Sequence, residues 1–310
     1  MKLRAVPKMS LIYLDQNALI SLGKRARTTD FRKRLDSFFS ARTDAIVLSF
    51  WHLVETSYGR NPERSGELAD FIESLDPAWL VERHEILRLD VLDDFCKHLR
   101  LDHEPTPRVV SRSEMFAGLD RQTGGPSFRG TLRQFVALWR KHRLEVGYEE
   151  SAKVADRMRR AKKSGKVTPQ ATVRAARELI RSVLPKFTPS GLQIPPSTAK
   201  EYLSQVDFSS IPSVALDVAI SGYEWAQSGA LGTARNTLID KVHLLSALPY
   251  ADELVTDDHL FYGVHDVAKR TGHVRARLLE CGEFLRRFED NRLKSSAGAS
   301  ECSVPPKEER

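Results

Sequence analysis

The segment Leu11-Ile12-Tyr13-Leu14-Asp15 predicts a short buried strand that ends in a carboxylate. Its four apolar residues have no helical period, and further polar residues follow Asp15 at once. Two other apolar runs, 45–49 and 253–256, predict strands of the same kind, and Asp257-Asp258 directly follows the second. Because helical patterns separate these strands, we expect an α/β fold with a mostly parallel central sheet.

The other elements follow from the same kind of pattern. Apolar residues spaced three or four apart predict helices. These predicted helices are 17–23, 30–40, 50–58, 63–75, 84–100, 212–225, 236–248 and 282–289. A last strand is expected near 274–279, whereas the glycines and prolines of 101–135 predict an irregular connection.

The composition is that of a globular protein. The chain has 310 residues, of which 41% are apolar, so it is long enough to bury a substantial core. No apolar run approaches the length of a membrane span, so we expect no membrane partner. The three cysteines, Cys96, Cys281 and Cys302, show no metal-binding spacing. A sparse, odd set of cysteines is typical of a reducing compartment, which favours a cytoplasmic protein.

The net charge of +7 is unevenly distributed. Residues 101–200 contain 20 Lys/Arg and 9 Asp/Glu, a net charge of +11, and the rest of the chain carries −4. We therefore predict a first core part at 1–100, a basic and mainly helical insertion at 101–204, a second core part at 205–290 and a disordered tail at 291–310.

The insertion contains a dense basic run that predicts contact with a polyanion, for which nucleic acid is the usual candidate. Such side chains bind backbone phosphates without reading the base sequence. The residues are Arg157, Arg159, Arg160, Lys162, Lys163 and Lys166. A solvated surface explains the same charges without any partner, so composition alone leaves both interpretations open.

Carboxylates gather where the predicted strands end. Asp15 follows the first strand, Glu55 lies on the helix after the second, Asp240 lies near the start of the helix before the late strand, and Asp257 and Asp258 follow that strand. Open parallel sheets bind ligands at the carboxyl ends of their strands, so these acids are expected at one edge. Their charges would repel, and Mg²⁺ or Mn²⁺ would relieve that repulsion. Each acid taken alone is more commonly a helix cap or a solvated side chain.

Three nearby residues have simpler interpretations. His52 lies three residues before Glu55, and His243 lies three residues after Asp240. We interpret both histidines as core or surface residues. We interpret Asp252 as a turn or supporting residue.

The acids occur in four motifs whose order resembles that of the PIN-domain nucleases. The family's first motif, an apolar strand followed by Asp-x-Asn, is similar to residues 12–20. Its second, a strand, a serine and then an acid, is similar to 46–55. Its third is an aspartate early in a helix, similar to Asp240. Its fourth is the strand into which that helix runs, ending Thr-x-Asp and similar to 254–258.

The resemblance covers 11–75 and 236–288 and implies a PIN-like three-layer α/β/α fold. It implies a set of catalytic acids that hold Mg²⁺ or Mn²⁺. These are Asp15, Glu55, Asp240 and Asp258, with Asp257 as a substitute or assisting ligand. Asn17 and Thr256 are implied to orient them.

The function implied by the resemblance is that of a metal-dependent endonuclease, with RNA preferred over DNA. It would hydrolyse backbone phosphodiester bonds with a metal-activated water and leave 5′-phosphate and 3′-hydroxyl ends. A toxin or defence role, a protein inhibitor or regulator and a homodimer are compatible with it. Two alternatives stay open: a non-catalytic nucleic-acid-binding module whose acids are structural, and a flap-type DNA nuclease.

Overall fold

The structure is a computed structural model. It describes residues 9–40, 44–123, 128–142, 195–226 and 234–289, together with individual residues between 174 and 183. The basic run at 157–166 and the tail at 291–310 lie outside the described residues. What the sequence predicts for them therefore stays a prediction.

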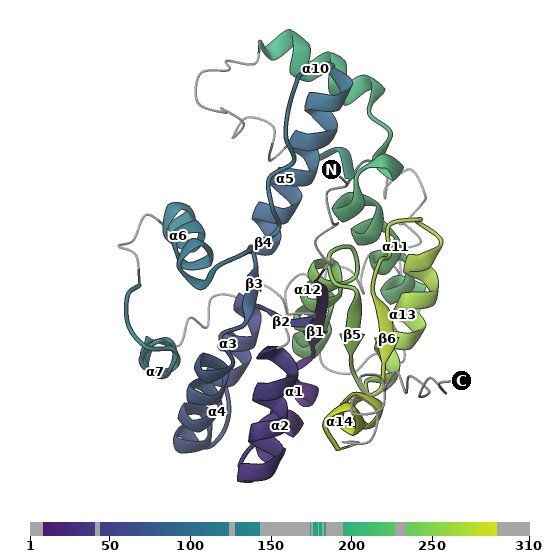
Figure 1. Cartoon of the computed structure of the whole chain (residues 1–310). Coiled ribbons are helices and arrows are strands. Elements are labelled where there is room, and N and C mark those ends of the chain that lie inside the picture. The colour runs from purple at the N-terminus through teal and green to yellow at the C-terminus, as the bar shows by residue number, and fades with distance from the viewer. Residues whose placement is uncertain are drawn as a thin grey trace, which may run out of the picture.

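A six-stranded sheet forms the centre of the described chain (Figure 1). Its strands are β1 (Ser10–Leu14), β2 (Asp44–Ser49), β3 (Ala78–Leu80), β4 (Val109–Val110), β5 (Glu253–Val255) and β6 (Arg277–Leu279). Their order is β4-β3-β2-β1-β5-β6, and within it β4 runs antiparallel to β3 while the other pairs are parallel. The expected α/β class with a mostly parallel sheet is thus confirmed.

Helices cover both faces of this sheet (Figure 1). One face packs against α1 (Gln16–Arg25), α2 (Thr29–Ser40), α3 (Phe50–Ser57), α4 (Pro62–Leu75), α6 (Arg112–Thr123), α7 (Leu132–His142) and α14 (Cys281–Glu289). The other packs against α11 (Pro212–Ala226), α12 (Ala234–Ala247) and α13 (His259–Lys269). A further apolar cluster joins α11 to α5 (Arg83–His98), α10 (Pro196–Gln205) and the 3₁₀ turn η2 (Phe208–Ser210).

The central strand β1 is buried on both faces. Ile12 and Leu14 point into the core on the α1 side, whereas Tyr13 points into the core on the α12 side. Strands in the middle of a parallel sheet are covered by helices on both sides, so they are continuous apolar runs. This burial explains why residues 11–14 predicted a strand.

The segment expected to be an irregular connection contains regular structure, so that prediction was wrong. β4 and α6 lie within 101–135, and α7 begins in it. Phe116 and Phe135 pack in the same core as α1. Glycines and prolines bound these short elements instead of replacing them. The division at 101 and 204 stays a prediction, although β4 and α7 join the sheet and core of the first part.

The strand order changes direction beside β1. From β1 the chain moves outward to β2 and β3 on one side, whereas β5 and β6 lie on the other. In such sheets the loops after the two strands at the change of direction diverge and leave room for a ligand. These are the loops that begin with Asp15 after β1 and with Thr256 after β5.

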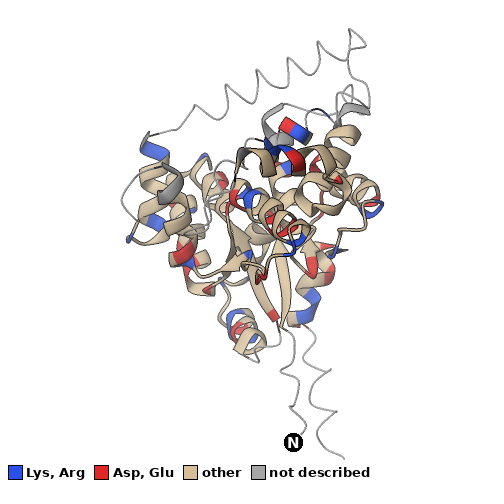
Figure 2. Cartoon of the chain, turned by 90° about the horizontal axis from the view of Figure 1, so that it is seen from above, with Lys and Arg blue, Asp and Glu red and all other residues tan. Residues whose placement is uncertain are grey.

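The described surface carries charges of both signs. Figure 2 shows acidic and basic positions interspersed over the helices. Among the described helices, none is long and apolar enough to cross a membrane.

Candidate acidic site at the carboxyl edge of the sheet

Asp15 is held rigidly at the end of β1. Its side chain is buried, and its Oδ1 accepts a hydrogen bond of 2.6 Å from the backbone N–H of Ala18, which caps α1. Its Oδ2 accepts one of 2.5 Å from the hydroxyl of Thr256. The Thr256 oxygen in turn accepts the backbone N–H of Asp258 at 3.0 Å. Thr256 therefore ties the ends of β1 and β5 together.

Glu55 and Asp240 approach this edge from α3 and α12. Burial, and then the charge of Asp258, raise the pKa of Asp240 to about 7. Glu55 and Asp15 also contribute to this raised value, whereas His243 opposes it. The fold thus brings Asp15, Glu55 and Asp258 close enough for their charges to act on Asp240.

Asp258 and Asp257 have different surroundings. Asp258 is half-buried, accepts the backbone N–H of Leu260 at 2.8 Å as the cap of α13, and acts on Asp240. Asp257 is exposed and accepts the backbone N–H of Cys281 at 2.9 Å, at the start of α14. The charge of Asp258 thus acts on Asp240, whereas that of Asp257 helps to raise the pKa of Asp15.

Asn17 is less engaged than the sequence pattern implied. It is exposed on the first turn of α1, and no hydrogen bond from its side chain to the acids is found within the described ranges. Its supporting role stays a prediction.

A buried chain of polar groups lies behind Glu55. Nε2 of His243 donates to Oε2 of Glu55 over 2.9 Å. Nδ1 of His243 lies 2.5 Å from the hydroxyl of Tyr13, and that hydroxyl lies 2.9 Å from Oγ of Ser49. Tyr13 is fully buried, and His243 is almost so. The chain therefore fixes the Glu55 carboxylate from the core side.

His52 completes this buried cluster in its neutral form. Its Nδ1 accepts the backbone N–H of Ser49 at 3.0 Å, so Nε2 donates to the carbonyl of Leu14 at 2.6 Å. Burial, followed by the neighbouring His243, lowers the pKa of His52 to about 3. The expectation of a structural histidine is confirmed for His52. His243 is also buried, but it contacts a candidate ligand.

The donor set suits a hard divalent cation. The four acids offer only oxygen atoms as ligands. Their mutual repulsion contributes to the raised pKa of Asp240. No three His, Cys, Asp or Glu side chains in the described part stand in a ready-made coordinating arrangement. Binding would therefore require the four acids to move closer together than they stand in this arrangement.

Sequence reasoning missed the role of Tyr13, and it gave Ser49 only as the serine of the second motif. One signal was available, because a tyrosine in a strand that is buried on both faces needs a partner for its hydroxyl. Asp252, expected as a supporting residue, accepts the backbone N–H of Leu11 at 2.9 Å and pairs with Arg275. That expectation is confirmed.

Comparison with known proteins found no match: no family model, no curated protein and no solved structure is significantly similar to this chain.

Proposed function

We propose that this chain is a metal-dependent endonuclease with a PIN-like fold, and that its substrate is RNA. The observation that carries the proposal is the convergence of Asp15, Glu55, Asp240 and Asp258 at one edge of the sheet, where burial and the neighbouring acids raise the pKa of Asp240. Carboxylates from four separate elements that repel one another at the switch point of a parallel sheet are typical of a cation site.

The acids would divide the work of holding Mg²⁺ or Mn²⁺. Asp15 offers an oxygen whose position is set by Ala18 and Thr256. Glu55 is oriented by His243. Asp240 and Asp258 supply the remaining charge. When bound, the cation supplies activation of the nucleophile and neutralisation of charge for an in-line displacement at phosphorus.

A non-catalytic nucleic-acid-binding module is the second candidate. It is favoured by the caps, because Asp15, Asp257 and Asp258 all accept backbone N–H groups at helix starts. Structural caps need no further role. Glu55 and Asp240 have no such capping contact within the described ranges, which supports the nuclease over this alternative.

The test is a cleavage assay on labelled single-stranded RNA, tRNA, single-stranded DNA and flapped DNA. It is run with Mn²⁺, with Mg²⁺ and with chelator, beside Asp15→Asn. We expect cleavage that requires the metal, prefers RNA and is lost in the variant. Normal cleavage by Asp15→Asn would show that the site is wrong. Salt-sensitive binding without cleavage in any metal would favour the module, and preference for the flap would favour a DNA nuclease.

The setting of this activity is also a proposal. Cys96 and Cys281 are free and buried, which supports a cytoplasmic location. A toxin or defence role, a protein inhibitor and a homodimer stay predictions.

A further inference from the structure

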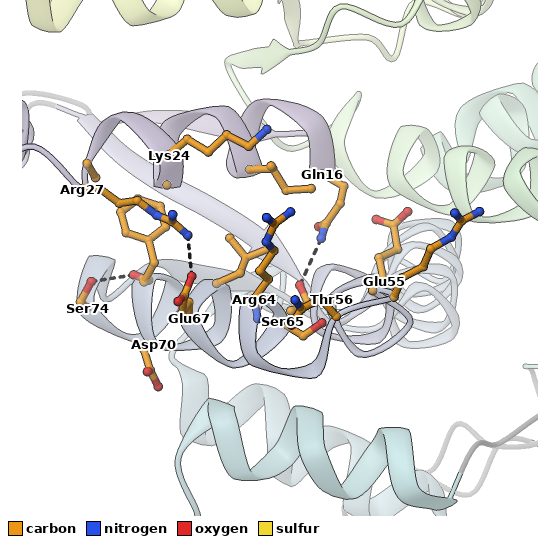
Figure 3. Close-up of a pocket in the computed structure, with 18 of the residues that line it drawn as sticks. Gln16, Lys24, Arg27, Glu55, Thr56, Arg64, Ser65, Glu67, Asp70 and Ser74 are labelled. Atoms are coloured by element: carbon orange, nitrogen blue, oxygen red, sulfur yellow. Dashed lines mark hydrogen bonds and ion pairs between the residues drawn. The ribbon is translucent and has the colours of Figure 1, made fainter.

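A groove runs away from the acidic site between α1 and the pair α3–α4. It has a volume of about 1220 Å³. Figure 3 shows Gln16 and Glu55 at one end and Ser74 at the other. Because Glu55 lines both the groove and the acidic site, a ligand in the groove would continue directly into that site.

The groove carries excess positive charge that no carboxylate within the described ranges neutralises. Two of its arginines are paired, Arg27 with Glu67 at 2.5 Å and Arg32 with Asp36 at 2.8 Å. The other basic side chains that line it are Lys24, Arg60 and Arg64. All three are exposed, and none forms an ion pair with a carboxylate of the described residues.

The free charges face one another across the groove. Figure 3 shows Arg64 reaching from α4 toward α1, while Lys24 extends along α1 on the opposite wall. Cations that line the same groove repel one another, and an anion between them would relieve that repulsion. Asp70 lines the same wall, but it does not neutralise these cations because it is paired with Arg133.

Apolar side chains line the groove between these charges. They are Ile20, Leu68 and Phe71, and the ring of Phe71 is half-buried. Single-stranded nucleic acids bind through a cationic groove for the backbone and through aromatic or apolar surface for the bases. A duplex hides the faces of its bases and would leave this apolar wall uncovered. The lining therefore favours an unpaired strand.

We infer that this groove holds the single-stranded segment of polynucleotide next to the phosphodiester at the acidic site, with Lys24, Arg60 and Arg64 as its phosphate contacts. The inference rests on the proposed function, from which it takes the polynucleotide. It adds the strandedness of the substrate and the direction in which the strand leaves the acids.

The test measures binding without cleavage. Fluorescence anisotropy in chelator follows a labelled single-stranded RNA of about 12 nucleotides, the single-stranded DNA of the same sequence and the RNA duplex, over a range of salt concentrations. The groove variant is Lys24→Gln/Arg60→Gln/Arg64→Gln. The matched control is Lys269→Gln/Arg270→Gln/Arg286→Gln, which removes the same charge from exposed positions on α14 and at the end of α13.

We expect the wild type to bind the single strand at least tenfold more tightly than the duplex. The groove variant should lose at least tenfold in affinity for the single strand. Its slope of log Kd against log salt should fall by about 2, the value for three lost phosphate contacts. The control variant should keep the wild-type affinity for the single strand and the wild-type salt slope. Equal losses in the two variants, tighter binding of the duplex, or no binding by the wild type would each overturn the inference.

The result is separable from that of the cleavage assay. Metal-dependent cleavage that is lost in Asp15→Asn but unchanged in the groove variant, at substrate below saturation, would keep the proposed function and remove the groove. Groove-dependent binding without cleavage in any metal would keep the groove and remove the nuclease. The RNA and DNA arms identify which polynucleotide the groove prefers.

Discussion

Asp240 is a carboxylate that the fold holds at a cost in stability. Its folded-state pKa of about 7 lies above the ordinary value of 3.8. A carboxyl whose pKa is raised on folding binds its proton more tightly in the folded state. The contribution of this group to folding stability is therefore fully present below its unfolded-state pKa and is lost as the pH rises through about 7.

This penalty predicts that Asp240→Asn stabilises the metal-free protein. In chelator near pH 8 we expect a gain on the order of 1–2 kcal/mol, after allowing for partial exposure of the group, and a melting temperature higher by roughly 2–8 °C. Near pH 4 the difference should vanish, because Asp240 is then protonated. Thermal melts at the two pH values measure it. Adding Mn²⁺ should raise the melting temperature of the wild type only.

An equal melting temperature of the two proteins near pH 8 would contradict this prediction. It would mean that the charge of Asp240 is not opposed by its neighbours.

Tyr13 tests whether the buried chain behind Glu55 serves the site. Tyr13→Phe keeps the ring but removes the hydroxyl that contacts His243 and Ser49. We expect the Mn²⁺ concentration for half-maximal cleavage to rise roughly tenfold, since supporting hydrogen bonds of this kind typically matter by 10–100-fold. The stability loss should be about 1–2 kcal/mol.

The matched control for Tyr13→Phe is Tyr250→Phe. The hydroxyl of Tyr250 is hydrogen-bonded to Asp90, in a different network. Its removal should cost similar stability and leave the metal requirement unchanged. If both variants shift the metal requirement alike, Tyr13 acts only through stability.

At the scale of elements, a buried ion pair joins α5, α11 and the segment before β4. Nη2 of Arg108 lies 2.8 Å from Oδ1 of Asp90, and the two side chains are 8% and 2% exposed. Asp90 also accepts the backbone N–H of Ser213 at 3.0 Å and the hydroxyl of Tyr250. Every acceptor of this buried carboxylate is thus used to hold one element against another.

Arg108→Ala should therefore be strongly destabilising. It leaves the Asp90 charge buried without its cation, which typically costs about 3–5 kcal/mol. Urea unfolding followed by circular dichroism measures this loss. Arg133→Ala is the control, because it breaks an exposed pair with Asp70, for which we expect less than about 1 kcal/mol. A similar loss of stability in Arg108→Ala and Arg133→Ala would mean that the hydrogen bonds from Ser213 and Tyr250 stabilise the Asp90 carboxylate without Arg108.

At the scale of the whole molecule, charge is segregated by sequence. Residues 101–200 carry a net charge of +11, whereas the rest of the chain carries −4. A polyanion would be attracted by the middle of the chain and cut at acids contributed by its two outer parts. Binding and cleavage should therefore respond to different substitutions.

Replacing the six residues of the basic run by glutamine tests this separation. The residues are Arg157, Arg159, Arg160, Lys162, Lys163 and Lys166. We expect KM for RNA to rise at least tenfold, kcat to stay within about twofold, and the salt slope of binding to fall by up to about 4. Cleavage kinetics at several salt concentrations measure all three. A fall in kcat with unchanged KM would contradict the prediction.

The class of the fold and the strand ends that carry acids could be predicted from the order of the residues. Strand β1 is buried on both faces, so residues 11–14 had to be an uninterrupted apolar run. Strand ends are polar, so Asp15 and Thr256-Asp257-Asp258 marked the edge of the sheet. The strands β3 and β4 escaped prediction, because three and two residues carry almost no periodic signal, whereas the equally short β5 was marked by the acid pair that follows it.

Which side chains meet could not be predicted, because it depends on how distant elements pack. The contact of His243 with Glu55 spans 188 residues of sequence, and that with Tyr13 spans 230. Local periodicity sets the face on which a residue lies, but it holds no information on which distant element packs there. The action of Asp258, not Asp257, on Asp240 depends on packing between distant elements in the same way. So does the gathering of Lys24, Arg60 and Arg64 in one groove, where no described carboxylate pairs with them.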